Sequence, residues 1–374
     1  MHRRTACARK ERPTNTTLFP LGPYAPPTAQ PLALTLRLRG ETIVGIEPPH
    51  AGYCHRGIAA LVEGKTVDEA RPLVEHSCSF AGTAHRIALC RALEAAAGAT
   101  VEPPAQATRI LFLEIERILA RLWLLGLTSR GMGLTHLWQT ALEQREALFA
   151  ALETATGARA FWAIATPGGV RADLELDPLR AALEGLDSAA ADWRVASGPQ
   201  GSLGRTGKGM GVLTEERARA LGLHGPAGAG SYADEDARRT DEGYEALAVE
   251  WPATDQKRTG DVAARLAFAA EDLASSLAIT QKCLAGLPAG ESGAARPLKL
   301  PTGDLALRGV VEGPHGPVTL TATHRAAGTL HDLRIETATP AALAALPEAL
   351  EGKPLAHALP TLASLDLCLE CLDQ

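Results

Sequence analysis

Three cysteines at opposite ends of the chain are the residues best suited to chemistry. Cys78 lies in a segment that reads EHSCSFAGTAHR, and Cys368 and Cys371 form a CxxC in the last seven residues. Cysteine thiolates bind soft or borderline metal ions, and a CxxC presents two sulfur atoms to one ion from a single turn. A third cysteine from a distant segment would complete such a site, so these three are the candidate metal ligands. Alternatively they only pack, because free cysteine also behaves as a small apolar residue.

Three further residues have side chains that can take part in proton transfer near such a site. His85 follows Cys78 by seven residues, about two turns if the segment is helical, so both can face one site. Glu114 and Glu116 lie beside an arginine in the clearest helical pattern of the chain, residues 109–125. Buried carboxylates of this kind either carry protons or form a salt-bridged packing face. We take His85, Glu114 and Glu116 as candidate catalytic residues.

These segments, together with several short motifs, resemble one known family. The order is Cys-x-x-(Cys)-x-x-x-His near the front of the chain and Asp-x-Cys-x-x-Cys at its end. Other motifs agree in order and spacing, among them Gly22-Pro23, Gly40-Glu41, His55-Arg56-Gly57-Ile58, Pro167-Gly168-Gly169-Val170 and Gly225-Pro226. Over most of its length the chain resembles the large subunit of energy-converting, membrane-bound (group 4) nickel-iron hydrogenases and the related D-type subunit of NADH:quinone oxidoreductase. The resemblance implies an Fe-S small subunit and ion-translocating membrane subunits as partners.

The sequence departs from this family at the metal site. The family holds its nickel-iron pair with four thiolates, and Ala81 stands where one bridging cysteine is expected. The other three positions are matched by Cys78, Cys368 and Cys371. Gln30 falls where the family carries a proton-transferring glutamate, and Ala229 falls where the hydrogenases place an arginine over the metals. The resemblance therefore implies a degraded site, which holds either a metal ion (nickel and iron, or zinc) on three cysteines or no metal.

The local patterns predict an α+β protein that is mainly helical. Period-two alternation over residues 32–39 and 42–46, on both sides of Gly40-Glu41, predicts a β-hairpin. Long helical patterns follow and predict a helical bundle core. They cover residues 65–97, on both sides of Cys78, and residues 109–125, 135–152, 174–197 and 261–284. The glycine- and proline-rich residues 285–316 predict a long loop, and two strands are expected at 318–323 and 329–335.

We expect one domain over residues 19–374, similar to a hydrogenase large subunit. It would consist of a β region at 19–50, a helical core at 51–284, and a final part at 285–374 with the loop, the strands and the CxxC. Residues 1–18 are basic, polar and poor in large apolar groups, so we expect them to form a disordered extension.

Composition excludes several classes of function. With 374 residues and 46% apolar content, the chain can bury a substantial core. A net charge of -6 and scattered basic residues argue against a nucleic-acid interface. Seven cysteines without a signal peptide predict a reducing, cytoplasmic location. No stretch reaches the roughly 20 apolar residues of a membrane span, so we expect attachment to the cytoplasmic face of the inner membrane through partner subunits.

Three functional hypotheses remain. The first is a D-type subunit of a membrane-associated oxidoreductase complex, which acts as a structural and proton- or conformation-coupling scaffold without standard nickel-iron hydrogen turnover. The second is a redox enzyme with an altered metal site on Cys78, Cys368 and Cys371. The third is a metal-free interaction protein whose cysteines only pack.

Overall fold

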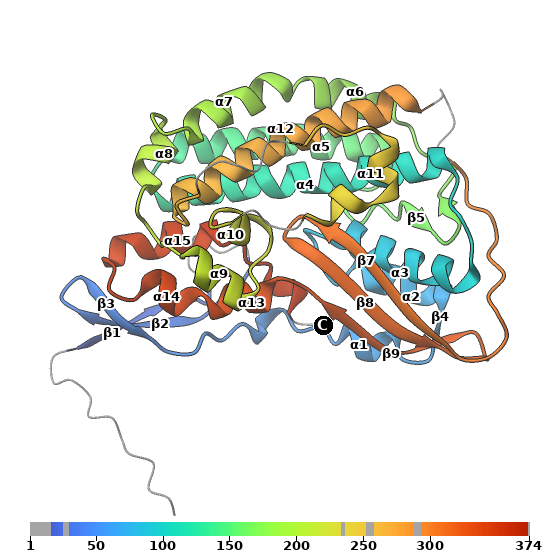
Figure 1. The fold of residues 1–374 in the computed structure, drawn as a ribbon, viewed down its shortest axis with the longest axis horizontal. Coiled ribbons are helices and arrows are strands. Elements are labelled where there is room, and N and C mark those ends of the chain that lie inside the picture. The colour runs from blue at the N-terminus through green and yellow to red at the C-terminus, as the bar shows by residue number, and fades with distance from the viewer. Residues whose placement is uncertain (1–15, 25–29, 233–235, 252–257, 288–292, 373–374) are drawn as a thin grey trace, which may run out of the picture.

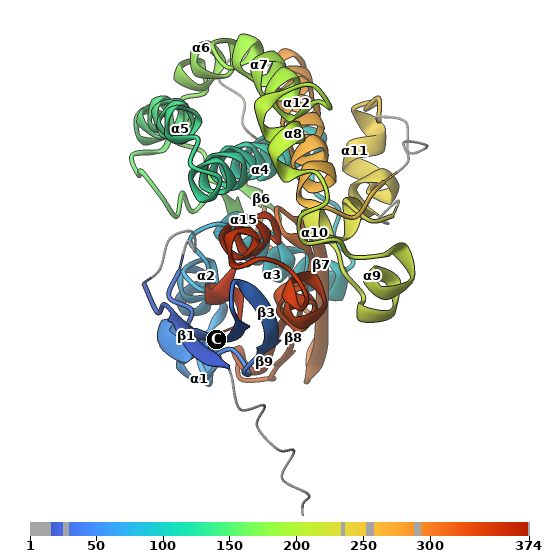
Figure 2. The same ribbon diagram turned by 90° about the vertical axis from the view of Figure 1, so that its left-hand side faces the viewer.

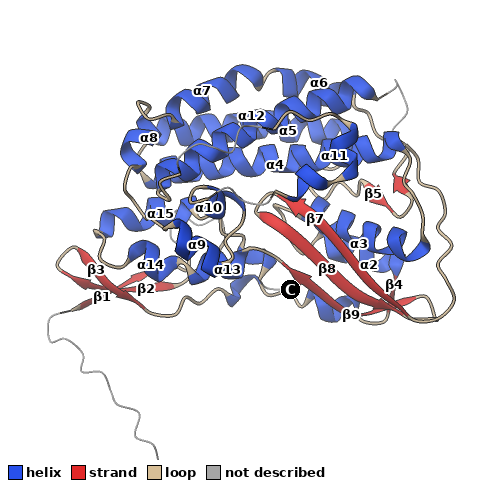
Figure 3. Ribbon diagram, in the orientation of Figure 1, coloured by secondary structure: helices blue, strands red, loops and turns tan. Residues whose placement is uncertain are grey.

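The computed structural model describes residues 16–24, 30–232, 236–251, 258–287 and 293–372. It confirms an α+β fold that is mainly helical, with a helical bundle, a four-stranded sheet backed by helices, and a three-stranded sheet beneath the C-terminal helices (Figure 1, Figure 3). Residues 1–15 of the expected extension lie outside the described residues.

The bundle is built around α4 (Pro103–Gly131), which is buried on almost every face. Prolines at its first two positions suit the start of a helix, where backbone N–H groups have no partner within the helix. Helix α12 (Val262–Gly286) packs along α4, and the Asp261 side chain caps it by accepting the N–H of Ala264. Figure 2 looks along this bundle, which is completed by α5 (Thr135–Thr156), α6 (Asp177–Glu184) and α7 (Asp187–Ser197).

The larger sheet is antiparallel, with strand order β4-β9-β8-β7. Its strands are β4 (Lys65–Thr66), β7 (Leu305–Gly313), β8 (Gly316–His324) and β9 (Thr329–Glu336). Helices α2 (Val67–Glu75) and α3 (Gly82–Ala97) pack on it. Helix α3 lies so close to β7 that a Cβ on Gly309 would be 1.9 Å from the carbonyl oxygen of Ala88. Helix α3 is therefore packed closely against the sheet.

The smaller sheet joins the two ends of the sequence. It has the order β1-β2-β3, formed by β1 (Thr17–Leu21), β2 (Leu34–Arg39) and β3 (Thr42–Ile46). The inward residues of β2 and β3 share one apolar core with α13 (Thr339–Ala344), α14 (Leu346–Leu350) and α15 (Ala358–Ser364). This packing brings the segment after α15, with the CxxC, into the interior.

Short elements connect these parts. They are η1 (Gly52–Cys54), α1 (Ile58–Val62), β5 (Ala165–Thr166), β6 (Gly169–Val170), α8 (Ser202–Gly207), α9 (Glu215–Leu221), α10 (Gly225–Ala229), η2 (Ala237–Thr240), α11 (Glu242–Ala246), η3 (Leu355–His357) and η4 (Leu369–Cys371). Among the described helices, none combines the length and the apolar composition that a membrane span requires.

The structure confirms the elements predicted from apolar periodicity, namely the hairpin at 32–46, the strands β8 and β9 and the long helices. It differs from the predicted boundaries at three places. The loop expected over 285–316 is wrong in its second half, because β7 occupies 305–313. Thr17 and Leu18, which we assigned to the extension, begin β1 and pair with β2. The helix expected over 174–197 is broken into α6 and α7 around Gly185, which has a low helix propensity.

Candidate functional site

The three candidate cysteine ligands meet in the interior. Their sulfur atoms lie within 4.8 Å of one another, and the Sγ atoms of Cys78 and Cys368 are 3.2 Å apart. Cys78 lies in the turn between α2 and α3, whereas Cys368 immediately precedes η4 and Cys371 ends it. All three side chains are buried. The packing thus brings together thiols that are almost 300 residues apart.

Side-chain hydrogen bonds hold the two cysteine segments together. The Glu370 carboxylate accepts the backbone N–H of Ser79 at 2.6 Å. The amide oxygen of Gln30 accepts the N–H of Leu369 at 2.7 Å, and its nitrogen lies 3.9 Å from Cys368 Sγ. Gln30, which the hydrogenase resemblance aligns with a glutamate, therefore contacts the cysteine cluster directly, as an amide.

The three thiols differ in acidity. Burial, together with hydrogen bonds among the cysteines, holds the pKa of Cys78 well above its usual range. Hydrogen bonds from Cys371 and Cys78, with the nearby His315, hold the pKa of Cys368 well below it. The negative charge of the cluster is thus concentrated on Cys368. A bound cation would add positive charge and favour the thiolate form at all three positions.

His85 lies at the edge of the cluster. Burial lowers its pKa to about 4, so the imidazole is neutral at pH 7. The Ser77 hydroxyl donates to the Val74 carbonyl, so it must accept from Nδ1–H of His85. This leaves the lone pair of Nε2 facing Cys371 Sγ at 3.8 Å. His85 is therefore placed as a neutral acceptor beside one of the thiols.

A second histidine and an aspartate also border the cluster, and the sequence patterns did not identify either as a site residue. Nδ1 of His315, in the turn between β7 and β8, lies 2.9 Å from a carboxylate oxygen of Asp366. Burial alone would lower the pKa of His315, but the Asp366 charge raises it to about 10. An imidazolium next to Cys368 compensates the thiolate charge. No spacing pattern marks His315, because it lies in a glycine- and proline-rich turn.

The two candidate glutamates occupy different surroundings. Glu116 lines a cavity that also reaches Cys78, and its carboxylate accepts the N–H groups of Thr83 and Ala84 at the start of α3. Burial raises the pKa of Glu116 to about 8 in spite of these bonds. The structure therefore places Glu116, with His85, near the cysteines.

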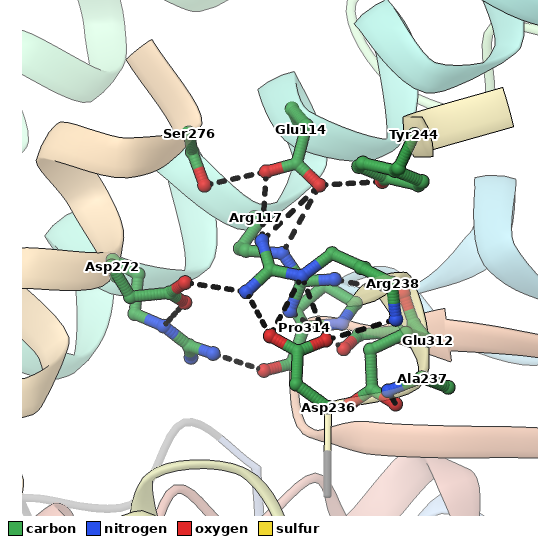
Figure 4. Close-up of polar contacts among 12 residues, drawn as sticks. Glu114, Arg117, Asp236, Ala237, Arg238, Tyr244, Asp272, Ser276, Glu312 and Pro314 are labelled. Atoms are coloured by element: carbon green, nitrogen blue, oxygen red, sulfur yellow. Dashed lines mark hydrogen bonds and ion pairs between the residues drawn. The ribbon is translucent and has the colours of Figure 1, made fainter. Parts of the chain in front are cut away.

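Glu114 instead belongs to a buried charge network on the other side of α4 (Figure 4). Its carboxylate accepts hydrogen bonds from Tyr244 and Ser276, each at 2.6 Å, and lies 3.1 Å from the Arg238 guanidinium. Arg238 also pairs with Asp272 at 2.7 Å. Arg238 and its neighbouring arginines hold the pKa of Asp272 well below its usual range, against the opposing effect of burial. The carboxylates of this network are satisfied by permanent cations.

The network extends toward the cysteines through Arg121. This guanidinium lies 2.8 Å from Asp272 and 3.1 Å from Asp366, the partner of His315. An unbroken series of buried charged contacts therefore runs from Glu114 in the bundle to the residues beside Cys368.

The cysteine cluster fits a single soft metal ion. Thiolates bound to one zinc ion lie about 2.3 Å from it and therefore about 3.8 Å from one another. The sulfur separations, 3.2 Å for one pair and at most 4.8 Å within the set, are close to this value. Ala81, which the hydrogenase resemblance aligns with a fourth cysteine, is buried and carries only a methyl group. Three sulfur donors leave one coordination position of such an ion open.

Comparisons with known proteins agree with this architecture. The model of the family "Respiratory-chain NADH dehydrogenase, 49 Kd subunit" matches residues 132–307. A D-type subunit of NADH-quinone oxidoreductase from Sinorhizobium medicae is 31% identical over 281 residues, which cover 74% of this chain and 69% of the relative. The carbon monoxide-induced hydrogenase of Rhodospirillum rubrum is 27% identical, with 81% and 84% of the two chains covered.

One solved structure is also similar to this chain, over nearly the whole length of both chains. A chain of the membrane-bound sulfane sulfur reductase, described as an archaeal respiratory membrane complex, superimposes with a TM-score of 0.86 at 25% identity. The match covers 96% of this chain and 99% of that one. The chain thus belongs to the family of D-type subunits of NADH-quinone oxidoreductase.

Proposed function

We propose that this chain is the D-type subunit of a membrane-associated oxidoreductase complex. Its partners would be an Fe-S small subunit and ion-translocating membrane subunits, which would hold it on the cytoplasmic face of the inner membrane. The similarity to D-type subunits of NADH-quinone oxidoreductase and to a chain of a respiratory membrane complex, the latter over 96% of the length, supports this assignment.

Within the complex we assign the chain a structural and coupling role. The observation that carries this role is the series of buried contacts from Glu114 through Arg238, Asp272 and Arg121 to Asp366. Removing one charge from a buried ion pair leaves its partner uncompensated, so loss of any member of the series destabilises the members next to it. The series provides a physical connection between the bundle and the cysteine cluster.

Standard nickel-iron hydrogen turnover is not part of the proposed function. The centre of the nickel-iron hydrogenases that the chain resembles needs four thiolates, and at the fourth position the buried methyl group of Ala81 has no lone pair to donate. Gln30, which contacts Cys368, cannot exchange a proton as a carboxylate does. Both residues support this part of the proposal, because each lacks the group that the hydrogenase resemblance expects at its position.

A second candidate function is favoured by the geometry of the cysteines. Cys78, Cys368 and Cys371 would hold one metal ion, iron, nickel or zinc, within a redox enzyme of altered chemistry. When bound, such an ion would supply a Lewis acid with an open position. The residues around it would orient the cluster and balance its charge, His315 as a cation and His85 as a neutral acceptor.

Purification of the tagged full chain from membranes tests the proposed function. We expect an Fe-S protein and integral membrane proteins to copurify in equal amounts with the chain. We also expect no hydrogen uptake or evolution by the purified complex. Recovery of the chain alone from the soluble fraction, or hydrogen turnover that disappears in Cys78→Ala, would contradict the proposal.

A further inference from the structure

A cavity of about 200 Å³ opens beside Cys78 and has a mostly apolar wall. Its apolar lining comes from α4, α5, the loop before β5 and Phe80 in the turn between α2 and α3, and its polar lining includes Glu116 and Arg145. The series of charged contacts from Glu114 to Asp366 does not involve this cavity.

Arg145 is an unusual member of this lining. Its side chain is only 9% exposed, and among the described residues no carboxylate lies within ion-pair distance of it. One nitrogen donates to the Leu119 carbonyl at 2.6 Å. The guanidinium instead lies over the rings of Trp123, Phe149 and Phe80, at 4.7, 5.3 and 5.7 Å from their centroids. Aromatic faces stabilise a cation without neutralising it, so the positive charge of Arg145 is left for a ligand.

The hydrogen-bonding capacity of Arg145 is also largely unused. A guanidinium carries five N–H donors, and Leu119 is its one acceptor among the described residues. Burial lowers the pKa of Arg145 to about 10, which leaves it charged at neutral pH. A buried cation with unused donors, in a low-dielectric cavity, attracts an anion with acceptor atoms.

Glu116, the one carboxylic acid among the described residues that line the cavity, does not compensate this charge. Both carboxylate oxygens of Glu116 are directed to the backbone of Thr83 and Ala84, away from an ion pair with Arg145. Because burial raises the pKa of Glu116 to about 8, most of its population is neutral at pH 7. The cavity therefore has an excess of about one positive charge.

The outer wall of the cavity is held in a strained conformation. Phe161 and Ala163 both have positive φ, 56° and 54°, which residues other than glycine rarely adopt. The N–H of Ala163 donates to Glu75 at 2.9 Å, and Glu75 pairs with Arg86 at 2.8 Å in the interior. Strain of this kind is maintained by the surrounding structure and is common at ligand sites. Here it presents Phe161 and Trp162 to the cavity.

We propose that this cavity binds a small, singly charged anion with an apolar or polarisable body, and that Arg145 is its binding residue. One cation balances one negative charge, and the aromatic wall accepts a weakly hydrated body but would strip water from a multiply charged ion at high cost. The ligand would lie beside Cys78. A role of this ligand in the chemistry of the cysteines rests on the proposed oxidoreductase function. Binding of the ligand in the cavity does not depend on that function.

Equilibrium dialysis of the purified full chain with thiocyanate, at constant ionic strength, tests this proposal. We expect one saturable site and at least tenfold weaker binding in Arg145→Met. Arg159→Gln is the matched control, because Arg159 also lies over Phe149 but is exposed and paired with Glu146. This control should bind within twofold of the wild type. Absence of saturable binding, or equal affinity in Arg145→Met, would overturn the proposal.

Two further measurements separate this site from others. Acetonitrile, a neutral molecule of similar shape, should not displace thiocyanate from the wild type, and this result does not depend on the stability of any variant. Equal competition by acetonitrile would show an apolar pocket without anion selectivity and overturn the proposal. Cys78→Ala should keep thiocyanate binding even if it loses a metal ion. Loss of binding in Cys78→Ala but not in Arg145→Met would place the anion on the metal and overturn the assignment to Arg145.

Discussion

At the scale of single residues, the candidate site was predictable where residues share a short segment. Glu114 and Glu116 are two positions apart on α4, which rotates their directions by about 200°, and the structure accordingly places them in different surroundings. The helical spacing accounts for this separation, although both glutamates were predicted as candidates near one site. The roles of His315 and Arg145 were not predictable, because they depend on contacts between distant elements.

Glu116 should make stability depend on pH. Its pKa is raised to about 8 in the folded chain from an unfolded value near 4.5, so between these pH values the folded state keeps a proton that the unfolded state has lost. Stability therefore falls as pH rises through this window. In Glu116→Gln, we expect the fall in unfolding free energy between pH 5 and pH 8 to shrink by on the order of 3 kcal/mol.

Urea unfolding at both pH values measures this effect in the wild type, in Glu116→Gln and in the control Glu153→Gln, whose side chain is exposed. A Glu116→Gln variant with the same pH dependence as the control would show that Glu116 is ionised in the folded chain.

At the scale of elements, periodicity predicted the segments in which it is strong. The hairpin of β2 and β3, the helix α4 and the strands β8 and β9 all follow from regular apolar spacing. Strand β7 was missed because Gly309 interrupts its apolar alternation, and glycine usually weakens a strand. The structure supplies the reason for this glycine, which is the close approach of α3. Strand β1 was missed because it contains Pro20, and proline argues against a strand. The structure explains this proline, because β1 lies at a sheet edge, where proline is tolerated.

Replacement of Gly309 should therefore be costly. In Gly309→Ala the new methyl group would meet the Ala88 carbonyl oxygen, and α3 or β7 would have to move. We expect a loss of about 1–3 kcal/mol in unfolding free energy. The control is Gly286→Ala at the end of α12, where an added Cβ meets nothing within 4 Å. Thermal or urea unfolding of both variants decides the matter, and equal stability would mean that α3 and β7 are not packed as described.

At the scale of the whole molecule, the chain closes on itself. The C-terminal helices pack on the N-terminal sheet, and η4 then reaches the turn between α2 and α3. No local pattern predicts that Cys78 and Cys368 meet, because their separation in sequence exceeds any periodicity. The collinear family motifs implied this meeting, and the 3.2 Å contact between their sulfur atoms is consistent with it. What the motifs did not indicate is the connection of the cluster to the bundle through Arg121.

The most direct test of the account is the amount of nickel, iron and zinc assignable to this chain in the complex purified from membranes. The geometry of Cys78, Cys368 and Cys371 predicts one ion per chain, lost in Cys78→Ala and retained in Cys90→Ala, because Cys90 is buried in the core outside the cluster. Nickel and iron together, both lost in Cys78→Ala, would mean that the nickel-iron centre survives on three thiolates. No metal in the wild type would contradict the metal site and leave a scaffold without one.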